Sequence, residues 1–172
     1  MSALVCLDMH APQNNLIKGK TMELVAREEK IIHGISTRTR NASEMDPATS
    51  KIAPLWQKFD KHVDVEYKKG YRVFGIYSDY ESDMHGAFNV LAGTDQVNAK
   101  SSIALETKTI PAGSYLVFIA KGEMPKIAFE AWGQVWDYFS KDDRAYERAY
   151  TIDFEYYAHN EIQVHIAVKQ PG

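Results

Sequence analysis

The spacing of apolar residues along the chain predicts two amphipathic helices. In the first half, apolar residues recur at three- and four-residue steps, which is the period of one helix face, at Ile52, Leu55, Trp56, Phe59 and Val63. In the second half, the same spacing gives a buried stripe made of Ala128, Trp132, Val135, Trp136 and Phe139. Pro125 suits the first turn of the second helix.

Two starting points for the first helix remain open. Asp46 and Pro47 resemble an N-cap and a first helical position. Pro54 instead indicates that the regular helix begins near it, or that the first turns are kinked, because proline removes a backbone donor.

Segments rich in β-branched and aromatic residues predict strands on both sides of each helix. Residues 23–38 are expected to form one strand with a bulge or bend, because a charged stretch and Gly34 interrupt the apolar residues. Residues 105–121 are expected to bend at 111–113. The remaining strands are predicted as two pairs, at residues 71–80 and 87–97 and at residues 150–157 and 161–168.

The order of these elements repeats along the chain. An offset of 80 residues aligns LWQKF (55–59) with VWDYF (135–139) and Tyr77 with Tyr157, and an offset of 79 aligns residues 31–34 with 110–113. We interpret residues 22–98 and 104–170 as two βαββ units. Joined edge to edge, they predict an α+β fold: one curved antiparallel sheet, both main helices on one face, and a ligand groove between them.

Composition favours a single domain over residues 22–170. The chain has 172 residues, of which 45% are hydrophobic, and its net charge of -3 offers no general attraction to nucleic acid. Residues 1–21 lack periodicity and are expected to be a non-native or disordered extension. The single cysteine, Cys6, favours a reducing compartment, the cytoplasm, and no apolar run reaches the ~20 residues of a membrane span.

The segment TIDFEYY (151–157) places Asp153 and Glu155 among aromatic rings in an expected strand. A buried carboxylate without a partner costs several kcal/mol, so such an acid is hydrogen-bonded, protonated, exposed or awaiting a cation. A lipophilic cation would supply the missing charge, and ring faces would add about 0.5–2 kcal/mol. A solvated strand residue or a structural hydrogen-bond acceptor are the alternatives for Glu155.

The repeat also suggests which residues surround Glu155. At the offset that aligns the two tyrosines, Glu155 corresponds to Gly75, which would leave room opposite the charge. Strand alternation places Glu155 with Tyr157, and Gly75 with Tyr77, on one face. The candidate ligand-binding residues are therefore Glu155, Tyr77, Tyr157, Gly75, Trp132, Trp56, Phe118 and Tyr80. Core packing is the stronger interpretation for Trp56, because it matches Trp136 in the repeat, and the tyrosines are also ordinary strand formers.

No cofactor or metal site is expected. The acids in SDYESD (78–83) lack the glycine and terminal glutamate of a calcium loop, and His159 and His165 form no helix-spaced pair. The sequence also has no nucleophile elbow, phosphate-binding loop or dinucleotide fingerprint.

Several motifs resemble the GyrI-like proteins, which share the effector-binding domain of AraC-type and multidrug-sensing transcription activators. The resemblance spans residues 22–169 and is carried by APLWQKF (53–59), FGIYSDYE (74–81), TIPAGSYLVFIAKG (109–122), AWGQVWDYF (131–139), DFEYY (153–157) and EIQVHIAVK (161–169). The chain looks most similar to the stand-alone, integron cassette-associated drug-binding members.

The resemblance implies a cytoplasmic domain that binds amphipathic, often cationic, aromatic compounds in a hydrophobic cleft with a glutamate, which Glu155 matches. Residues 1–21 are too short for a helix-turn-helix module, so direct nucleic-acid binding is not expected. The expected partners are hydrophobic cationic small molecules and, besides these, a separate transcription-related protein or a second copy of the chain.

Three functions remain open at this stage, and the first is favoured. The first is a non-enzymatic sensor or sequestering module for aromatic cations. The second is a hydrolase of cyclopropane-bearing toxins, as in some GyrI-like proteins, with Glu155 as the general base and Tyr77 or Trp132 positioning the substrate. The third is a protein-interaction role like that of the gyrase-inhibiting members.

Overall fold

The computed structural model describes residues 22–170, and its main feature is one antiparallel sheet of eight strands. The strand order is β1-β8-β10-β9-β4-β5-β2-β7. The strands are β1 (Met22–Arg27), β2 (Lys30–Thr39), β4 (Val73–Ser78), β5 (Phe88–Thr94), β7 (Glu106–Ile110), β8 (Gly113–Lys121), β9 (Asp153–Ala158) and β10 (Glu161–Ala167).

Two main helices pack on this sheet, α2 (Ile52–His62) and α3 (Lys126–Phe139). The smaller elements are α1 (Asn41–Glu44), the 3-10 helix η1 (Tyr67–Lys69), and a two-stranded sheet of β3 (Val63–Asp64) and β6 (Lys100–Ser101). The expected α+β class, with one sheet and two main helices, is confirmed.

The order of the elements agrees with the predicted duplication. One half contributes β2, α2, β4 and β5, and the other contributes β8, α3, β9 and β10 in the same sequence order. Across the contact of β9 with β4, the order β9-β10-β8 mirrors β4-β5-β2. The edge strands are exchanged between the halves, because β1 precedes β2 but pairs with β8, and β7 precedes β8 but pairs with β2.

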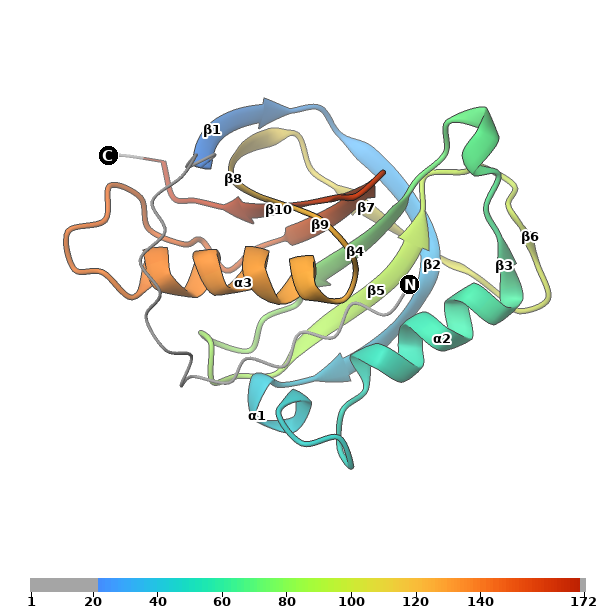
Figure 1. The fold of residues 1–172 in the computed structure, drawn as a ribbon, viewed down its shortest axis with the longest axis horizontal. Coiled ribbons are helices and arrows are strands. Elements are labelled where there is room, and N and C mark those ends of the chain that lie inside the picture. The colour runs from blue at the N-terminus through green and yellow to red at the C-terminus, as the bar shows by residue number, and fades with distance from the viewer. Residues whose placement is uncertain (1–21, 171–172) are drawn as a thin grey trace.

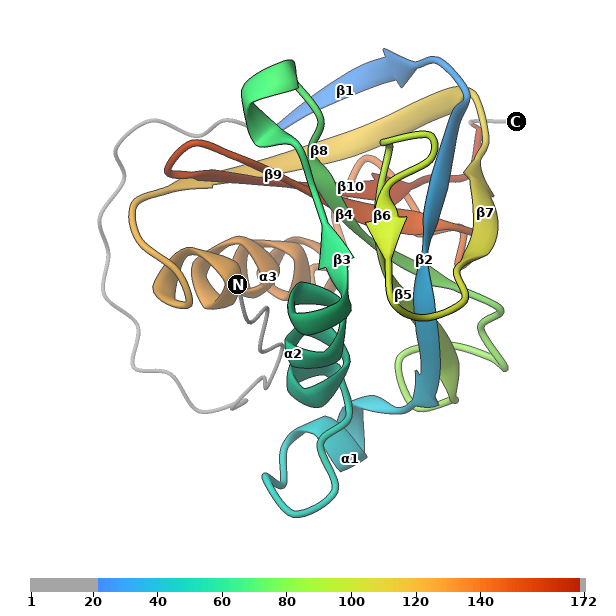
Figure 2. The ribbon, with the colours of Figure 1, turned by 90° about the vertical axis from the view of Figure 1, so that its right-hand side faces the viewer.

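This exchange forces the sheet to curl. Strands β1 and β2 are six positions apart in the sheet, about 29 Å if it were flat. Only Glu28 and Glu29 join them, and Arg27 to Lys30 spans at most about 11 Å. The link from β7 to β8 is equally short. Figure 1 shows β1 running into β2 as one arc. Figure 2 shows the sheet curved, with β1 and β8 along the top and the upper ends of β2 and β7 at the right.

The prediction of one bent strand over residues 23–38 is therefore corrected. The bend lies at Glu28–Glu29 and is sharp enough to make two strands that pair with different partners, while Gly34 lies within β2. The bend expected near residue 111 likewise separates β7 from β8. The two links are Glu28–Glu29 and Pro111–Ala112, and in the second the proline cannot donate to a strand ladder.

Side chains on the two sheet faces form two separate apolar clusters. The larger cluster lies under both helices and includes Trp56, Phe59, Trp132 and Val135 with inward-facing strand residues. The smaller cluster lies inside the curl of the sheet and consists of Ile32, Phe74, Ile76, Leu91, Ile110, Tyr115 and Phe154. The alternation of strand side chains assigns each residue to one of these faces.

Helix α2 begins at Ile52, in agreement with the start near Pro54 and not with the one at Asp46. The carboxylate of Asp46 instead accepts a hydrogen bond from the Ala48 amide in a turn. The buried Glu44 carboxylate accepts the amides of Lys51 (3.0 Å) and Ile52 (3.2 Å), so it satisfies donors that the first turn leaves unpaired. Helix α3 begins directly after Pro125, as expected.

Candidate functional site

The carboxylate of Glu155 lies on β9, beneath the helices, with no solvent exposure. Its Oε2 accepts a hydrogen bond of 2.8 Å from the indole Nε1 of Trp132, and its Oε1 accepts one of 3.0 Å from the Tyr77 hydroxyl. Both donors are neutral. Within residues 22–170, no lysine, arginine or histidine forms an ion pair with this carboxylate, so its charge is solvated only by dipoles.

Burial raises the pKa of Glu155 because it penalises the charged form, while hydrogen bonding from Trp132, followed by the Tyr157 and Tyr77 phenols, opposes the rise. Burial and the nearby carboxylate raise the pKa values of Tyr77 and Tyr157 well above their usual range, so both phenols stay protonated. The Tyr157 hydroxyl nevertheless makes no hydrogen bond of good geometry within the described residues.

Gly75 on β4 lies directly across from Glu155 on β9. A Cβ at Gly75 would lie 2.6 Å from Oε1 and 2.9 Å from Cγ of Glu155. The missing side chain thus leaves the room that the sequence predicted, but the Glu155 side chain itself fills that room. The absence of a side chain at Gly75 therefore allows the Glu155 carboxylate to occupy its observed position.

Asp153, two residues before Glu155, is equally buried but is paired with a cation. Arg148 donates to Asp153 Oδ2 over 2.7 Å, the Tyr80 hydroxyl donates to the same oxygen over 2.5 Å, and the Ala167 amide donates to Oδ1 over 2.8 Å. Burial disfavours the charge on Arg148, but the Asp153 carboxylate outweighs burial and raises the pKa of the guanidinium.

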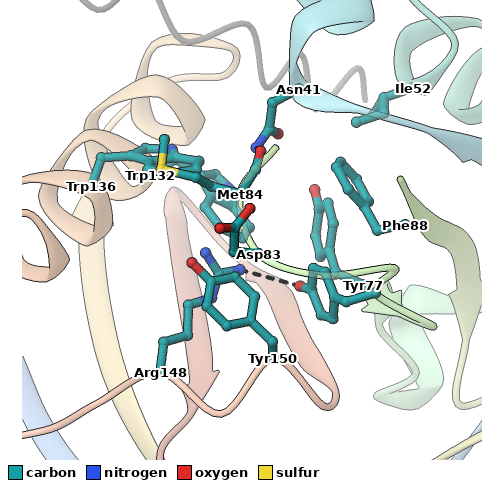
Figure 3. A pocket seen from close by; sticks show the side chains of 11 residues that line it. Asn41, Ile52, Tyr77, Asp83, Met84, Phe88, Trp132, Trp136, Arg148 and Tyr150 are labelled. Carbon is teal, nitrogen blue, oxygen red and sulfur yellow. Dashed lines mark hydrogen bonds between the residues drawn. The ribbon is translucent and has the colours of Figure 1, made fainter. Parts of the chain in front are cut away.

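A small cavity of about 20 Å³ lies between the helices and the sheet. Trp132 and Trp136 of α3 line one side, and Ile52 of α2 and Phe88 of β5 line the other, as Figure 3 shows. The rest of its lining is Asn41, Tyr77, Tyr80, Asp83, Met84, Arg148 and Tyr150. The space holds about one water molecule, so the site is closed in this conformation.

Aromatic rings in the lining of this cavity surround the guanidinium of Arg148. Its central carbon lies 4.6 Å from the ring centre of Tyr150, 5.5 Å from that of Tyr80 and 5.9 Å from that of Trp136. These separations are within the range of cation–π attraction. The rings of the site thus already hold one cation.

The structure brings most of the predicted site residues together. Tyr77, Tyr80 and Trp132 line the cavity, and Glu155 is hydrogen-bonded to two of them. The other predicted residues lie below or beside it: Gly75 and Tyr157 flank Glu155 in the sheet, Trp56 packs edge-on against Tyr157 at 5.6 Å, and Phe118 packs against Tyr138 and Phe139. Trp56 and Phe118 do not line the cavity.

Sequence reasoning missed Arg148 and Tyr150 as lining residues. They lie in an irregular segment between α3 and β9 that has no hydrophobic period to interpret. The available signal was the aromatic and basic composition of RAYERAY (144–150) just before the acid-bearing strand. Ile52 and Phe88 were also missed, since each fits an ordinary core position.

Two further features are absent from the part of the chain that the structure describes. No helix there has the length and apolar character needed to cross a membrane. Nor do three or more histidine, cysteine, aspartate or glutamate side chains of residues 22–170 gather as metal ligands would.

Comparison with known proteins gives consistent matches over nearly the whole chain. An integron cassette protein from the mobile metagenome of Vibrio cholerae is 37% identical, with a TM-score of 0.77 over 86% of this chain and 95% of its own. A protein solved with bound tetraphenylphosphonium is 18% identical and shares the fold, with a TM-score of 0.61 over 87% of this chain and 94% of its own.

A relative from Bacillus subtilis, YobU, is provisionally named a transcriptional regulator. It is 28% identical over 80% of this chain and 91% of its own length. Residues 23–168 match the family described as integron-associated effector binding protein. This chain therefore belongs to the integron-associated effector binding protein family.

Proposed function

We propose that this protein is an effector-binding module for hydrophobic, aromatic cations, which it binds between α2 and α3 with Glu155 as the counter-charge. One observation carries the proposal: among residues 22–170, the fully buried carboxylate of Glu155 is held by neutral donors alone. An uncompensated buried charge is costly and is retained where it has a use. A lipophilic cation would compensate it without bringing a strongly bound water shell into the core.

The rings next to Glu155 fit the same ligand class. Tyr77 and Trp132 pack edge to face, with ring centres 4.9 Å apart, and both donate to the carboxylate. An aromatic cation would find ring faces for its apolar part and a negative charge for its centre, and each cation–π contact adds about 0.5–2 kcal/mol. The rings that surround Arg148 in the cavity lining support this choice of chemistry.

Ligand entry requires the cavity to open, because about 20 Å³ cannot hold a ligand with several rings. The side chains that must separate are those of Trp132 and Trp136 on α3 and of Ile52 on α2. Of these, Trp136 is only partly buried, and its indole Nε1 has no hydrogen-bond partner among the described residues. Its displacement would break no hydrogen bond to that nitrogen, so it is the side chain expected to move first.

The test is a titration with tetraphenylphosphonium, and with neutral triphenylphosphine oxide as its uncharged counterpart. Glu155→Gln keeps the shape and removes the charge, so tetraphenylphosphonium should bind about 10- to 100-fold more weakly while the neutral compound is unaffected. Glu130→Gln, an exposed acid on α3, is the matched control and should change neither affinity. Equal tetraphenylphosphonium affinity in wild type and folded Glu155→Gln would exclude the charge role.

A second candidate, hydrolysis with Glu155 as general base, rests on the raised pKa of this carboxyl. Against it, Trp132 and Tyr77 cover the carboxylate, and the adjacent space holds about one water molecule. Turnover of a cyclopropane-bearing compound that is lost in Glu155→Gln would establish this reaction. Tight binding without turnover supports the binding module.

A further inference from the structure

A second, larger cavity lies inside the curl of the sheet, on the face away from α2 and α3. Its volume is about 380 Å³, which is in the range of small-molecule sites. Phe74, Phe154, Tyr156 and His165 contribute rings to its lining, and Arg27 and Lys30 contribute cations. No residue of this lining belongs to the cavity beside Glu155.

The rings of this second cavity form a continuous aromatic wall. Phe154 and His165 stack with their centres 4.2 Å apart and their planes 13° from parallel. Phe74 extends the wall, at 5.3 Å from Tyr156 and 6.4 Å from Phe154. Rings in this arrangement offer faces and edges to a further planar ring.

The guanidinium of Arg27 is fixed next to this wall. Its Nε donates to His165 Nε2 over 3.0 Å, and the histidine is 2% exposed. Burial, followed by the neighbouring Arg27, lowers the pKa of His165 to about 3, so the imidazole is neutral and accepts this hydrogen bond. Within residues 22–170, no carboxylate forms an ion pair with Arg27, which leaves its terminal nitrogens available for an anion.

The lining of this cavity carries two cations, Arg27 and Lys30, and one acid, Glu28. The Lys30 ammonium lies 5.4 Å from the ring centre of Phe74 and pairs with Asp95 over 3.3 Å. Glu28, the single acid of the lining, is exposed and lies in the link between β1 and β2. The cavity beside Glu155 differs in kind, because a buried uncompensated acid adjoins it.

We propose that the cavity inside the curled sheet binds a small planar aromatic carboxylate, with its ring against Phe74, Phe154 and Tyr156 and its carboxylate on Arg27. An aromatic monoanion matches both parts of the lining, and a guanidinium pairs with a carboxylate through two parallel hydrogen bonds. This site does not depend on the proposed cation site, since the two lie on opposite faces of the sheet and carry opposite charge preferences.

The experiment uses 2-naphthoate as the probe and 2-naphthalenemethanol as its neutral counterpart. Naphthoate should bind saturably with a Kd below about 1 mM, and the alcohol at least about tenfold more weakly. Saturating tetraphenylphosphonium should leave the naphthoate affinity unchanged. Competition between the two probes, equal binding of the alcohol, or no saturable naphthoate binding would each overturn the proposal.

Variants locate the site. Arg27→Gln should weaken naphthoate binding about tenfold or more, because a charged hydrogen-bonding partner is lost. Lys30→Gln should weaken naphthoate binding about two- to threefold. Because Lys30 is exposed, this substitution should not impair folding. Lys68→Gln, an exposed lysine of η1, is the charge-matched control and should have no effect. A shift of the His165 ring resonances on adding naphthoate is the direct readout, and unchanged resonances at saturation would place the ligand elsewhere.

Discussion

Asp153 and Glu155 occupy the same strand, face the same side of the sheet and are both fully buried, yet their surroundings differ in one respect. Asp153 meets a guanidinium at 2.7 Å. Glu155 meets an indole and a phenol. The first carboxylate is balanced by a cation, whereas the second, next to a cavity, has no cationic partner among residues 22–170.

The difference separates a structural acid from an acid available to a ligand. Breaking a balanced pair exposes the remaining charge to the apolar interior, so Asp153 and Arg148 should matter for folding. Neutralising an unbalanced acid removes a penalty, so Glu155 should matter for binding and little for folding. Because the folded-state pKa of Glu155 is raised, its ionisation lowers stability as pH rises from the ordinary carboxyl range toward that raised pKa.

Arg148→Met should destabilise the protein most. The change leaves Asp153 buried without its cation, so the free energy of unfolding should fall by about 3–5 kcal/mol, measured by urea denaturation at neutral pH. Arg144→Met, in the same segment, removes a hydrogen bond to the Lys141 carbonyl at the surface and should stay within about 0.5 kcal/mol of wild type. If Glu155→Gln lost as much stability as Arg148→Met, the contrast between the two acids would not stand.

A smaller loss is expected from Gly75→Ala, which tests the placement of the Glu155 carboxylate. The new Cβ would meet Glu155 Oε1 at 2.6 Å, so the side chain must shift, at about 1–3 kcal/mol of unfolding free energy. In a Glu155→Ala background the same substitution should cost less, which a double-mutant cycle measures. Gly133→Ala on α3, where a Cβ meets nothing within 4 Å, should stabilise by about 1 kcal/mol.

Trp132→Phe should have a smaller effect, because it removes one of the two neutral donors to Glu155. The Trp132 hydrogen bond favours the ionised form of Glu155, so its loss should raise the pKa of Glu155 further. Cation affinity falls as pH drops through that pKa, so the midpoint of tetraphenylphosphonium binding against pH should move up by about 0.5–1 unit. Trp136→Phe, which loses no such bond, should leave the midpoint in place; equal midpoints in both variants would contradict the assigned hydrogen bond.

Local patterns predicted the helices and most strands because those signals are periodic. The stripe that contains Trp132 and Val135 lies on α3, and both residues are buried as expected. The order of the strands in the sheet could not be predicted in this way, because β1 and β2 pair with strands that are distant in the sequence. A two-residue acidic link therefore looked like a bulge within one strand.

The residues of the candidate site could likewise be predicted only in part from the sequence. The family resemblance and the repeat pointed to Glu155, with Tyr77 on the same face and Trp132 as a pocket wall, and the structure places both within hydrogen-bond distance of the carboxylate. The sequence did not distinguish the role of Asp153, because its partner Arg148 lies in an irregular segment. Nor did it separate Trp56, which is core, from Trp136, which lines the cavity at the matching repeat position.

The alternation of side chains along β9 makes this strand a partition between two compartments. Glu155 projects toward the helices, and Phe154 and Tyr156 project into the curl of the sheet. Since both sets hang from one backbone, a substitution that shifts the β9 backbone would alter both compartments at once. Redesign of either compartment alone should therefore be made on elements that border only that compartment, such as α3 for the helix side, and leave β9 unchanged.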